Sequence, residues 1–450
     1  MKAAITFIPH DQFKNDKNLS RQPIAAIYLL GEIMRAEGID IRIIDPFTIR
    51  RTNSDYFEEI KRDILQDADV IFLSSNSYNW YNTKKVIDTI KSADEKIPVV
   101  LGGIHPTMMD IYVMETTKAD VIIRGEGEKI VSRVAKAVVT NPEDLCEIEG
   151  ITFRTSAGII KKNKDSEPLR EDEFEKYNAK CVFKELPADI YFGIPCETSR
   201  GCRFNCSFCG IAYHCSWKAL NTETIYKKLM ETAFCVRHKT NNGCITLTDD
   251  CITANRERFV NILNFFKEEL NDIGIIMEGR LNEIASEEVL NAMKENRIRR
   301  FLVGIECGYD EGLKRIRKGY TTEQIEKYLK TVKEAGLGSI IYCSFIIFLP
   351  WETEDDCLKT IHFAAKLVEK YGVKSNISIW NIIPSELWDK RKEYSLEVED
   401  SFFDTDLLQN ADEYERYLVQ IHPNITEKGY RKIKKVLSMY GARGIYLTNN

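Results

Sequence analysis

The chain has 450 residues, of which 44% are hydrophobic and 29% charged, and this composition is that of a globular protein with two or three domains. A net charge of −6 offers no electrostatic basis for binding nucleic acid, and no apolar run is long enough to span a membrane. The 13 cysteines, in a chain without an export signal, predict a cytoplasmic protein because thiols stay reduced in that compartment.

Residues 1–140 alternate short apolar segments with amphipathic segments of helical period. This alternation predicts an α/β domain of the doubly wound, Rossmann-like type, in which helices cover both faces of a parallel sheet. We expect strands over residues 3–8, 39–44, 70–74, 99–101 and 121–123, and helices over residues 23–36, 56–66 and 82–92.

Polar and glycine-rich stretches follow three of these strands at their carboxyl ends. Ligands of open parallel sheets bind at that edge, and glycine lets a flat or phosphate-bearing ligand approach the backbone closely. Ordinary tight turns would give the same pattern, so the residues alone leave both interpretations open. The candidate ligand-binding residues are Ser74, Ser75, Asn76, Tyr78, Gly102, Gly103, His105, Gly125 and Glu126.

Residues 141–190 are predicted to form an interdomain connection that contains a hairpin, with strands over 150–154 and 159–162 around a Ser-Ala-Gly turn. Beyond it, Cys202, Cys206 and Cys209 form a C-x3-C-x2-C motif in one short loop. Three thiolates placed this closely can converge on one soft metal centre. Iron–sulfur clusters normally take four thiolates, so a motif of three predicts a cluster with one iron left open for a cofactor or substrate.

Structural zinc is the alternative for this loop, with Cys215 or His214 as the fourth ligand. Zinc loops more often pair two C-x2-C knuckles, and the chain has no second knuckle, so the spacing favours a redox cluster. A disulfide is disfavoured in a chain without a secretory segment.

Residues 191–383 repeat strand and helix units that predict a partial (β/α) barrel of the TIM type. Strands are expected over 191–198, 244–248, 275–279, 301–305, 340–348 and 376–383. Polar residues stand where these strands end, and for the two aspartates a helix cap is the alternative role. These candidate site residues are Asp249, Asp250, Glu278, Arg280 and Glu306. Residues 384–450, with helices expected over 412–421 and 427–439, predict a small helical C-terminal cap.

The cysteine motif, with Phe208 before its last cysteine and strand–helix units after it, resembles the radical S-adenosylmethionine family. The resemblance implies that the three cysteines hold a 4Fe–4S cluster whose fourth iron binds the amino and carboxylate groups of S-adenosylmethionine. Reduction of the sulfonium, with an electron from a donor such as flavodoxin or ferredoxin, would yield methionine and a 5′-deoxyadenosyl radical.

The same resemblance implies roles for the strand-end residues. Asp249 and Asp250 stand where the family engages the methionine amino group, and Arg280 and Glu306 where it contacts the carboxylate or ribose of S-adenosylmethionine. The family commonly reads G-L-P-G-E where this chain has Phe348-Leu-Pro-Trp-Glu352. The two large rings in place of glycine predict core packing, with a narrowed adenine pocket as the alternative.

The ordered pattern of the first 135 residues resembles the cobalamin-binding domain of one radical S-adenosylmethionine subgroup. The matching pieces are residues 23–29, 39–45, 69–75, 98–106 and 124–128. The D-x-H-x-x-G motif that supplies a histidine ligand to cobalt elsewhere is absent, because His10 and His105 lack its context. Cobalamin, if bound, should therefore carry no histidine on its lower face.

Together the two resemblances imply a cobalamin-dependent radical enzyme, and a methyltransferase that acts on an unactivated carbon through methylcobalamin is the favoured function. Three alternatives stay open: a cyclase or ring-rearranging enzyme, a radical enzyme whose N-terminal domain no longer binds cobalamin, and a non-enzymatic cluster or zinc sensor, which is disfavoured. No catalytic residue is assigned, and the substrate, a small molecule or peptide, is not identified.

Overall fold

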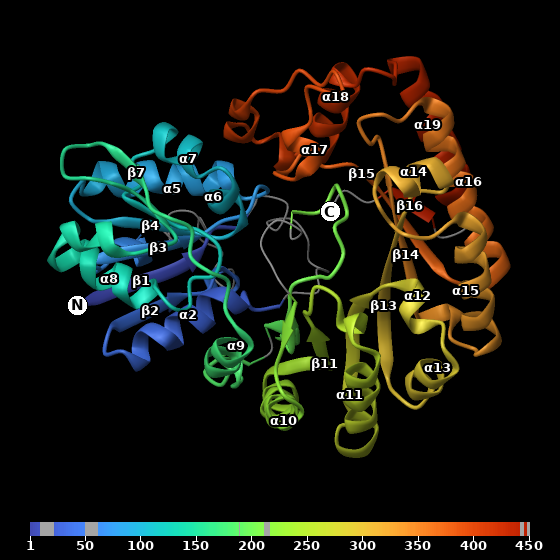
Figure 1. Ribbon diagram of the computed structural model, residues 1–450, viewed down its shortest axis with the longest axis horizontal. Helices are drawn as coiled ribbons and strands as arrows, with labels where there is room; N and C mark the ends of the chain where they lie inside the picture. Colours follow the sequence, from blue (N-terminus) through green and yellow to red (C-terminus); the bar gives the residue numbers. More distant parts are fainter. Residues whose placement is uncertain (10–21, 50–61, 189, 211–216, 442–444, 448–450) are drawn as a thin grey trace. The chain divides into compact units, whose positions relative to one another are not determined.

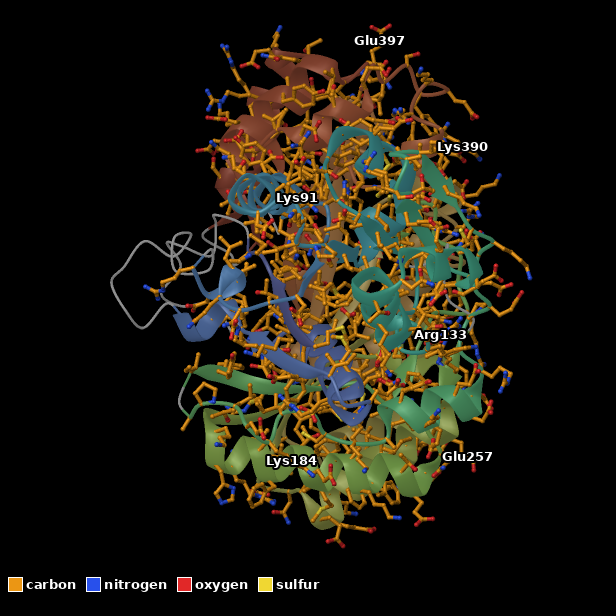
Figure 2. All side chains as sticks on the ribbon, turned by 90° about the vertical axis from the view of Figure 1, so that its left-hand side faces the viewer. Lys91, Arg133, Lys184, Glu257, Lys390 and Glu397 are labelled. Atoms are coloured by element: carbon orange, nitrogen blue, oxygen red, sulfur yellow. The ribbon has the colours of Figure 1, made fainter. Side chains whose placement is uncertain are left out.

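The computed structural model describes residues 1–9, 22–49, 62–188, 190–210, 217–441 and 445–447. The chain forms two compact units: Met1–Phe192 with Glu399–Asn410, and Gly193–Val398 with Ala411–Asn450. Each unit has its own sheet and its own core. Charged side chains such as Arg133, Lys184 and Glu257 are exposed at the surface (Figure 2). In the described part of the chain, no helix is long and apolar enough to cross a membrane.

The first unit contains a seven-stranded sheet in the order β2-β1-β3-β4-β5-β6-β7. Its strands are β1 (Lys2–Phe7), β2 (Asp40–Ile44), β3 (Val70–Ser74), β4 (Val99–Gly102), β5 (Val121–Ile123), β6 (Ile151–Arg154) and β7 (Ile160–Lys162). The first five are parallel, in register pairs such as Ala3 with Val70, so their carboxyl ends share one edge. Residues 70–73 are all buried, as expected for a strand with helices on both faces.

The helices of this unit lie on both faces of its sheet (Figure 1). They are α2 (Ala25–Ala36), α3 (Pro46–Ile49), α5 (Trp80–Ala93), α6 (Ile104–Met108), α7 (Asp110–Thr116), α8 (Val131–Thr140) and α9 (Glu171–Asn178). The predicted doubly wound fold is confirmed. Of the helix expected over residues 56–66, residues 62–65 are helical, and residues 56–61 lie outside the described residues.

The predicted hairpin is present, and it extends the first sheet. Strand β6 pairs antiparallel with β5, and β7 pairs antiparallel with β6. Arg124 anchors it, because its guanidinium donates to Thr152 Oγ1 at 2.6 Å, to the carbonyl of Asn163 at 2.7 Å and to Asp165 Oδ1 at 2.7 Å. The guanidinium of Arg124 therefore stabilises the first unit through these hydrogen bonds.

The second unit contains a seven-stranded sheet in the order β16-β15-β14-β13-β12-β11-β8. Its strands are β8 (Tyr191–Cys196), β11 (Thr240–Leu247), β12 (Gly274–Gly279), β13 (Ile298–Glu306), β14 (Ile341–Ile347), β15 (Lys374–Ile379) and β16 (Ile445–Leu447). The pairs from β11 to β16 are parallel. The sheet is open within the described residues, since β8 and β16 stand at opposite ends of its order, which makes it a partial barrel.

Helices cover one face of this sheet (Figure 1). The helices of this unit are α10 (Thr222–Lys239), α11 (Arg256–Glu269), α12 (Leu281–Ile284), α13 (Glu287–Lys294), α14 (Asp310–Arg315), α15 (Thr322–Glu334), α16 (Glu354–Tyr371), α17 (Glu386–Asp389), α18 (Ala411–Ile421) and α19 (Glu427–Gly441). Of these, α17 and α18 lie apart from the covered face (Figure 1). The two predicted C-terminal helices are confirmed as α18 and α19, whereas strand β16, which follows them, was not predicted.

Burial along β14 identifies the two faces of the sheet. Ile341, Cys343, Phe345 and Ile347 are buried, and the residues between them are only half-buried. Phe345 packs edge-on against Phe363 of α16, so the buried set faces the helices. The alternate set lines the concave face, which keeps access to solvent.

Candidate functional site

The cysteine loop follows two short strands, β8 and β9 (Ser199–Arg200), in the second unit. Cys202, Cys206 and Cys209 are all half-buried free thiols. The loop begins at Gly201, whose φ of +89° is a left-handed conformation that glycine adopts without strain. The N–H of Cys209 donates to the carbonyl of Cys206 at 3.1 Å, which closes a turn between the last two cysteines.

Asp249 and Asp250, at the end of β11, hold the start of this loop. Asp249 is fully buried and accepts from the Thr198 N–H at 2.9 Å and from the Thr198 hydroxyl at 2.7 Å. It also accepts from Ser199 Oγ and pairs with Arg258 at 3.0 Å. Asp250 Oδ2 accepts from the Gly201 N–H at 2.6 Å. The strand-end pair predicted as a cofactor site is therefore bonded to the backbone immediately before the first cysteine.

A second set of contacts holds the middle of the loop, and sequence reasoning missed it. The N–H of Ser207 donates to the carbonyl of Ile316 at 3.4 Å, and Arg317 Nε donates to the carbonyl of Asn205 at 2.6 Å. From α17, the Leu387 N–H donates to the carbonyl of Ser207 at 3.2 Å. These partners are about a hundred residues or more from the loop and belong to no motif, so nothing in the sequence could have identified them.

Arg280 and Glu306 are buried, and Arg280 contacts the cysteine loop. Arg280 Nη1 is 3.9 Å from Cys206 Sγ, and its Nη2 donates to the carbonyl of Lys318. Glu306, with a φ of +74° at the end of β13, pairs with the buried ammonium of Lys318 at 3.1 Å. Burial is the largest influence on Lys318 and opposes its charge, but Glu306, Tyr320 and Cys206 together outweigh burial and raise the pKa of Lys318.

The environment of the first cysteine favours its thiolate. A hydrogen bond from the Cys251 thiol, the N–H of Phe204 and the charge of Arg280 lower the pKa of Cys202, and burial opposes them. The same hydrogen bond, with burial, raises the pKa of Cys251. Metal centres bind cysteine as thiolate, so this asymmetry suits Cys202 as the ligand and Cys251 as its hydrogen-bond donor.

Two unpartnered donors at this loop fit an anionic cluster. Ser207 Oγ and Arg280 Nε are buried and have no hydrogen-bond partner among the described residues. A cluster ligated by thiolates would supply sulfur acceptors to such donors. Within the described ranges, no three His, Cys, Asp or Glu side chains, the motif cysteines included, are gathered closely enough to hold one metal ion. In a 4Fe–4S cluster each cysteine binds a different iron, so its ligands stand farther apart than those of a single ion. His214 and Cys215 lie outside the described ranges.

Glu278 ends β12 on the concave face and keeps access to solvent. Its side chain is exposed, yet desolvation by the surrounding sheet, followed by the charge of Asp250, raises the pKa of its carboxyl. Burial likewise raises the pKa of Asp250, against the hydrogen bond from Gly201. Phe208 places its ring centroid 5.9 Å from Lys318 Nζ, so it packs next to the Lys318–Glu306 pair.

The candidate residues of the first unit lie at the carboxyl edge of its sheet. The loop after β3 is rigid, because Asn79 Oδ1 accepts from Ser75 Oγ at 2.8 Å and from the Asn76 N–H at 2.7 Å. Asn76 Oδ1 in turn accepts from the Tyr78 N–H at 3.0 Å. This loop directly continues Ser74, the last residue of β3, and its polar side chains are engaged in shaping it.

The loops after β4 and β5 are joined by Thr107. Its hydroxyl donates to the carbonyl of Gly103 at 2.7 Å and accepts from the Gly125 N–H at 3.0 Å. A Cβ on Gly103 would lie 2.3 Å from the carbonyl oxygen of Ser75, whereas a Cβ on Gly102 or Gly125 would meet no atom within 4 Å. The backbone edge at Gly102 and Gly125 therefore faces open space, which fits the approach of a flat cofactor such as a corrin.

His105 and Glu126 serve the fold of this unit. His105 is fully buried, stacked on Trp80 at 4.9 Å between ring centroids and packed edge-on against Phe403, and its Nδ1 is 3.1 Å from Ser77 Oγ. Burial lowers the pKa of His105 to about 3, so the ring is neutral. Glu126 Oε2 accepts from the Leu169 N–H at 2.8 Å.

The backbone at Phe348 has a conformation that glycine adopts more readily than phenylalanine. Phe348 has a φ of +67°, the left-handed region that disfavours a side chain. It is 1% exposed and packs edge-on against His422 and Tyr430, with ring centroids 5.9 and 6.1 Å away. Trp351 is half-buried and donates to Tyr309 OH at 3.2 Å. Core packing, the first of the two predicted roles, is the role of Phe348 in the structure.

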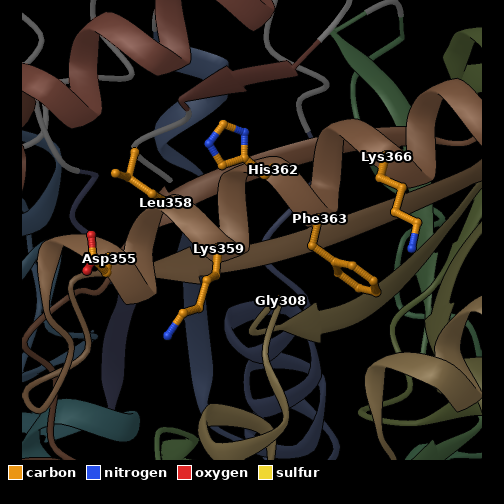
Figure 3. A pocket seen from close by; sticks show the side chains of 7 residues that line it. All are labelled: Gly308, Asp355, Leu358, Lys359, His362, Phe363 and Lys366. Atoms are coloured by element: carbon orange, nitrogen blue, oxygen red, sulfur yellow. The ribbon is translucent and has the colours of Figure 1, made fainter.

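A shallow groove of about 510 Å³ lies on the second unit, along α16. Its lining residues are Gly308, Asp355, Leu358, Lys359, His362, Phe363 and Lys366 (Figure 3). Lys359 pairs with Asp356 and Lys366 with Glu326, so the cations of the groove are neutralised by neighbouring residues. The groove contains none of the predicted site residues.

Comparisons with known proteins identify two domains in the chain. The family model of the B12 binding domain matches residues 22–135, and that of the radical SAM superfamily matches residues 196–364. An uncharacterised methyltransferase of Pyrococcus horikoshii is 30% identical over 357 residues, which cover 78% of this chain and 74% of that protein.

Two further proteins extend the comparison. An anaerobic magnesium-protoporphyrin IX monomethyl ester cyclase of Rubrivivax gelatinosus is 26% identical over 365 residues, which cover 76% of this chain and 61% of the cyclase. The structure of the radical S-adenosylmethionine methyltransferase TsrM from Kitasatospora setae, with cobalamin and a 4Fe–4S cluster bound, aligns with a TM-score of 0.69 at 16% identity. That alignment covers 89% of this chain and 76% of the TsrM chain, and it shows a shared fold.

Proposed function

Since the chain belongs to the radical S-adenosylmethionine superfamily, in the group that carries a B12-binding domain, we propose that it is a methyltransferase acting on an unactivated carbon. Its cofactors are those of its two domains: a 4Fe–4S cluster, S-adenosylmethionine and cobalamin. One observation carries the proposal: both domains occur in one chain that is 30% identical to a protein named as a methyltransferase.

The cluster with S-adenosylmethionine supplies a hydrogen-abstracting radical, and the cobalamin supplies a transferable methyl group. In the second unit, Cys202, Cys206 and Cys209 hold the cluster, and Asp249 and Asp250 fix the backbone that presents them. In the first unit, the open edge at Gly102 and Gly125 receives the corrin, and the loop bonds of Asn79 and Thr107 keep that edge rigid.

The concave face of the second unit is where we place S-adenosylmethionine. Asp250, which is half-buried, and Glu278, which is exposed, stand at adjacent strand ends, so two carboxylates border a region that is partly shielded from water at Asp250. A carboxylate in such a region attracts a cationic ligand more strongly than one in bulk water. The ammonium and sulfonium groups of S-adenosylmethionine carry such charge, which favours its binding beside these two residues.

We further propose that the protein works in the cytoplasm and takes its electron from a carrier such as flavodoxin or ferredoxin. The support is the thiol content: 12 described cysteines are free, and the proposed cluster loop requires reduced thiols. The chemistry requires one electron for each cleavage of S-adenosylmethionine, and one-electron carriers of low potential are the class of protein that supplies it.

A label experiment tests the proposal without knowledge of the substrate. Protein reconstituted anaerobically with iron, sulfide and hydroxocobalamin is incubated with S-adenosylmethionine carrying a deuterated methyl group and a reductant. Recovery of deuterated methyl on the corrin fraction, together with 5′-deoxyadenosine, is expected. A corrin that stays unlabelled while 5′-deoxyadenosine forms would contradict methyl transfer.

That second outcome would favour a cobalamin-dependent cyclase or ring-rearranging enzyme. The 26% identity to the magnesium-protoporphyrin ester cyclase supports this second candidate, since that relative is named for ring closure. Absence of corrin from the reconstituted protein would instead favour a radical enzyme whose first unit has lost its cofactor.

A further inference from the structure

Arg280 is a buried cation next to the cysteine loop, and among the described residues no carboxylate forms an ion pair with it. Arg258 pairs with Asp249 at 3.0 Å, and Lys318 pairs with Glu306 at 3.1 Å. Arg280 is 7% exposed, and within the described part of the chain it forms no ion pair. A buried charge without a counter-charge is costly to the fold, so an anion is expected to face this guanidinium.

The contacts of Arg280 show which side remains for that anion. Nη2 donates to the carbonyl of Lys318, and one face of the guanidinium lies 3.7 Å from the ring centroid of Phe204. Nη1 points at Cys206 Sγ, 3.9 Å away, and Nε has no partner among the described residues. The remaining hydrogen-bonding capacity of the side chain is therefore available next to a cysteine of the motif.

We propose that Arg280 is the counter-charge of the iron–sulfur cluster: it donates a charge-assisted hydrogen bond to the Cys206 thiolate and raises the reduction potential of the cluster. The inference rests on the proposed function, because it requires the cluster at Cys202, Cys206 and Cys209. Reduction adds one electron, delivered by the external one-electron carrier, and breaks no bond. A fixed positive charge stabilises the more negative, reduced cluster more than the oxidised one.

The geometry requires arginine at this position. Its planar guanidinium bonds the Lys318 carbonyl and the Cys206 sulfur through two different nitrogens while its face packs on Phe204. A lysine ammonium is a single point donor and cannot make these three contacts together. Lys318 does not substitute for it, because Glu306 neutralises Lys318.

The resemblance to the family suggested another anion for Arg280, the carboxylate of S-adenosylmethionine, and the two assignments differ in a measurable way. A counter-charge of the cluster changes its reduction potential when no S-adenosylmethionine is present. If the carboxylate were the only anion that Arg280 meets, replacing Arg280 would change the affinity for S-adenosylmethionine and leave the midpoint potential of the nucleoside-free cluster unchanged.

The test compares wild-type protein with Arg280→Met and Arg280→Lys. Arg237→Met is the control, because Arg237 lies on α10, is 38% exposed and pairs with Asp272. Each protein is reconstituted anaerobically, its iron is quantified, and the cluster is titrated by electron paramagnetic resonance without S-adenosylmethionine. At a fixed solution potential, the reduced-to-oxidised ratio is expected to fall at least tenfold in Arg280→Met, equal to a midpoint about 59 mV lower.

In Arg280→Lys, which keeps the charge and loses the paired geometry, the reduced-to-oxidised ratio is expected to fall about threefold, and in Arg237→Met less than twofold. If Arg280→Met takes up no iron, Arg280→Lys decides the comparison. Equal midpoints in wild-type protein and the Arg280 variant that carries the comparison would overturn this inference alone. Wild-type protein that assembles no cluster would overturn the proposed function and this inference with it.

Discussion

The buried carboxylate of Asp249 accepts hydrogen bonds from both the N–H and the hydroxyl of Thr198, at 2.9 and 2.7 Å. This contact joins the end of β11 to the residues just before the cysteine loop. The same carboxylate also forms an ion pair with Arg258. The aspartate thereby sets the position of the loop, whereas Asp250, its half-buried neighbour, lies closer to solvent.

We expect Asp249→Asn to lower the free energy of unfolding by about 3 kcal/mol, because it leaves Arg258 buried without a counter-charge. Urea unfolding of the metal-free protein measures this, and iron retention after reconstitution should fall in parallel. Glu223→Gln, which removes an exposed pair with Lys227, is the control and is expected to leave the free energy of unfolding nearly unchanged. Similar costs for the two variants would show that the Asp249 pair does not hold this region together.

Glu352 gives the fold a pH dependence of predictable sign. Burial raises the pKa of this carboxyl from 4.5 to about 8, against hydrogen bonds from the Leu349 N–H and the Tyr309 hydroxyl. Between those values the folded chain binds a proton that the unfolded chain releases. The free energy of unfolding should therefore decrease as pH rises from 4.5 to 8, and this contribution levels off above 8.

The neutral variant Glu352→Gln lacks this dependence. The difference in unfolding free energy between wild-type protein and the variant should change by about 1.4 kcal/mol per pH unit inside the window, in favour of the variant as pH rises. Urea unfolding at several pH values between 5 and 9 measures it. Parallel curves for the two proteins would mean that Glu352 titrates normally.

Two substitutions at Phe348 distinguish the contribution of ring packing from the strain of its left-handed backbone. Phe348→Ala loses the packing against His422 and Tyr430 but keeps a side chain at a φ of +67°, so a loss of about 4 kcal/mol is expected. Phe348→Gly loses the same packing and relieves the strain, so it should be about 1 kcal/mol more stable than Phe348→Ala. Thermal unfolding compares them, and a less stable glycine variant would refute the strain.

Because we place the corrin at the open edge at Gly102, side chains of increasing size at this position should progressively reduce the amount of bound cobalamin. Substitution by Ala, Leu and Phe should leave stability nearly unchanged, because a Cβ there meets no atom within 4 Å. Bound cobalamin, measured by visible absorption after gel filtration, should fall in that order of size. Gly103→Ala is the contrasting variant, since its Cβ would lie 2.3 Å from the Ser75 oxygen and should destabilise the unit even without cofactor. Full corrin retention by Gly102→Phe would place the cofactor elsewhere.

The alternation of apolar strands and amphipathic helices was sufficient to predict both sheets. It was insufficient for β16, because Ile445–Leu447 is too short to stand out from a helical C-terminal region. The pairing of β6 with β5 was also not predicted, because register depends on the partner strand and not on the hairpin itself.

The site was predictable where its residues form a motif. The cysteine loop and the strand-end aspartates do lie together, as their positions along the chain predicted. Arg258 and Arg317 were missed because each contacts a residue far along the chain: Arg317 lies 112 residues from its partner Asn205, and Arg258 lies 60 from Thr198. Thr107 was missed because it belongs to no motif. Arg280 was predicted as a site residue, but the contact of its guanidinium with Cys206 could be seen only in the folded structure.

The most direct test of the account is the electron paramagnetic resonance spectrum of the reduced, anaerobically reconstituted protein, recorded with and without S-adenosylmethionine. Three cysteines leave one iron of the cluster open, so the account predicts a cluster signal whose g-values change when S-adenosylmethionine is added. A spectrum that is identical with and without the nucleoside, or a loop that carries zinc and no iron, would contradict it.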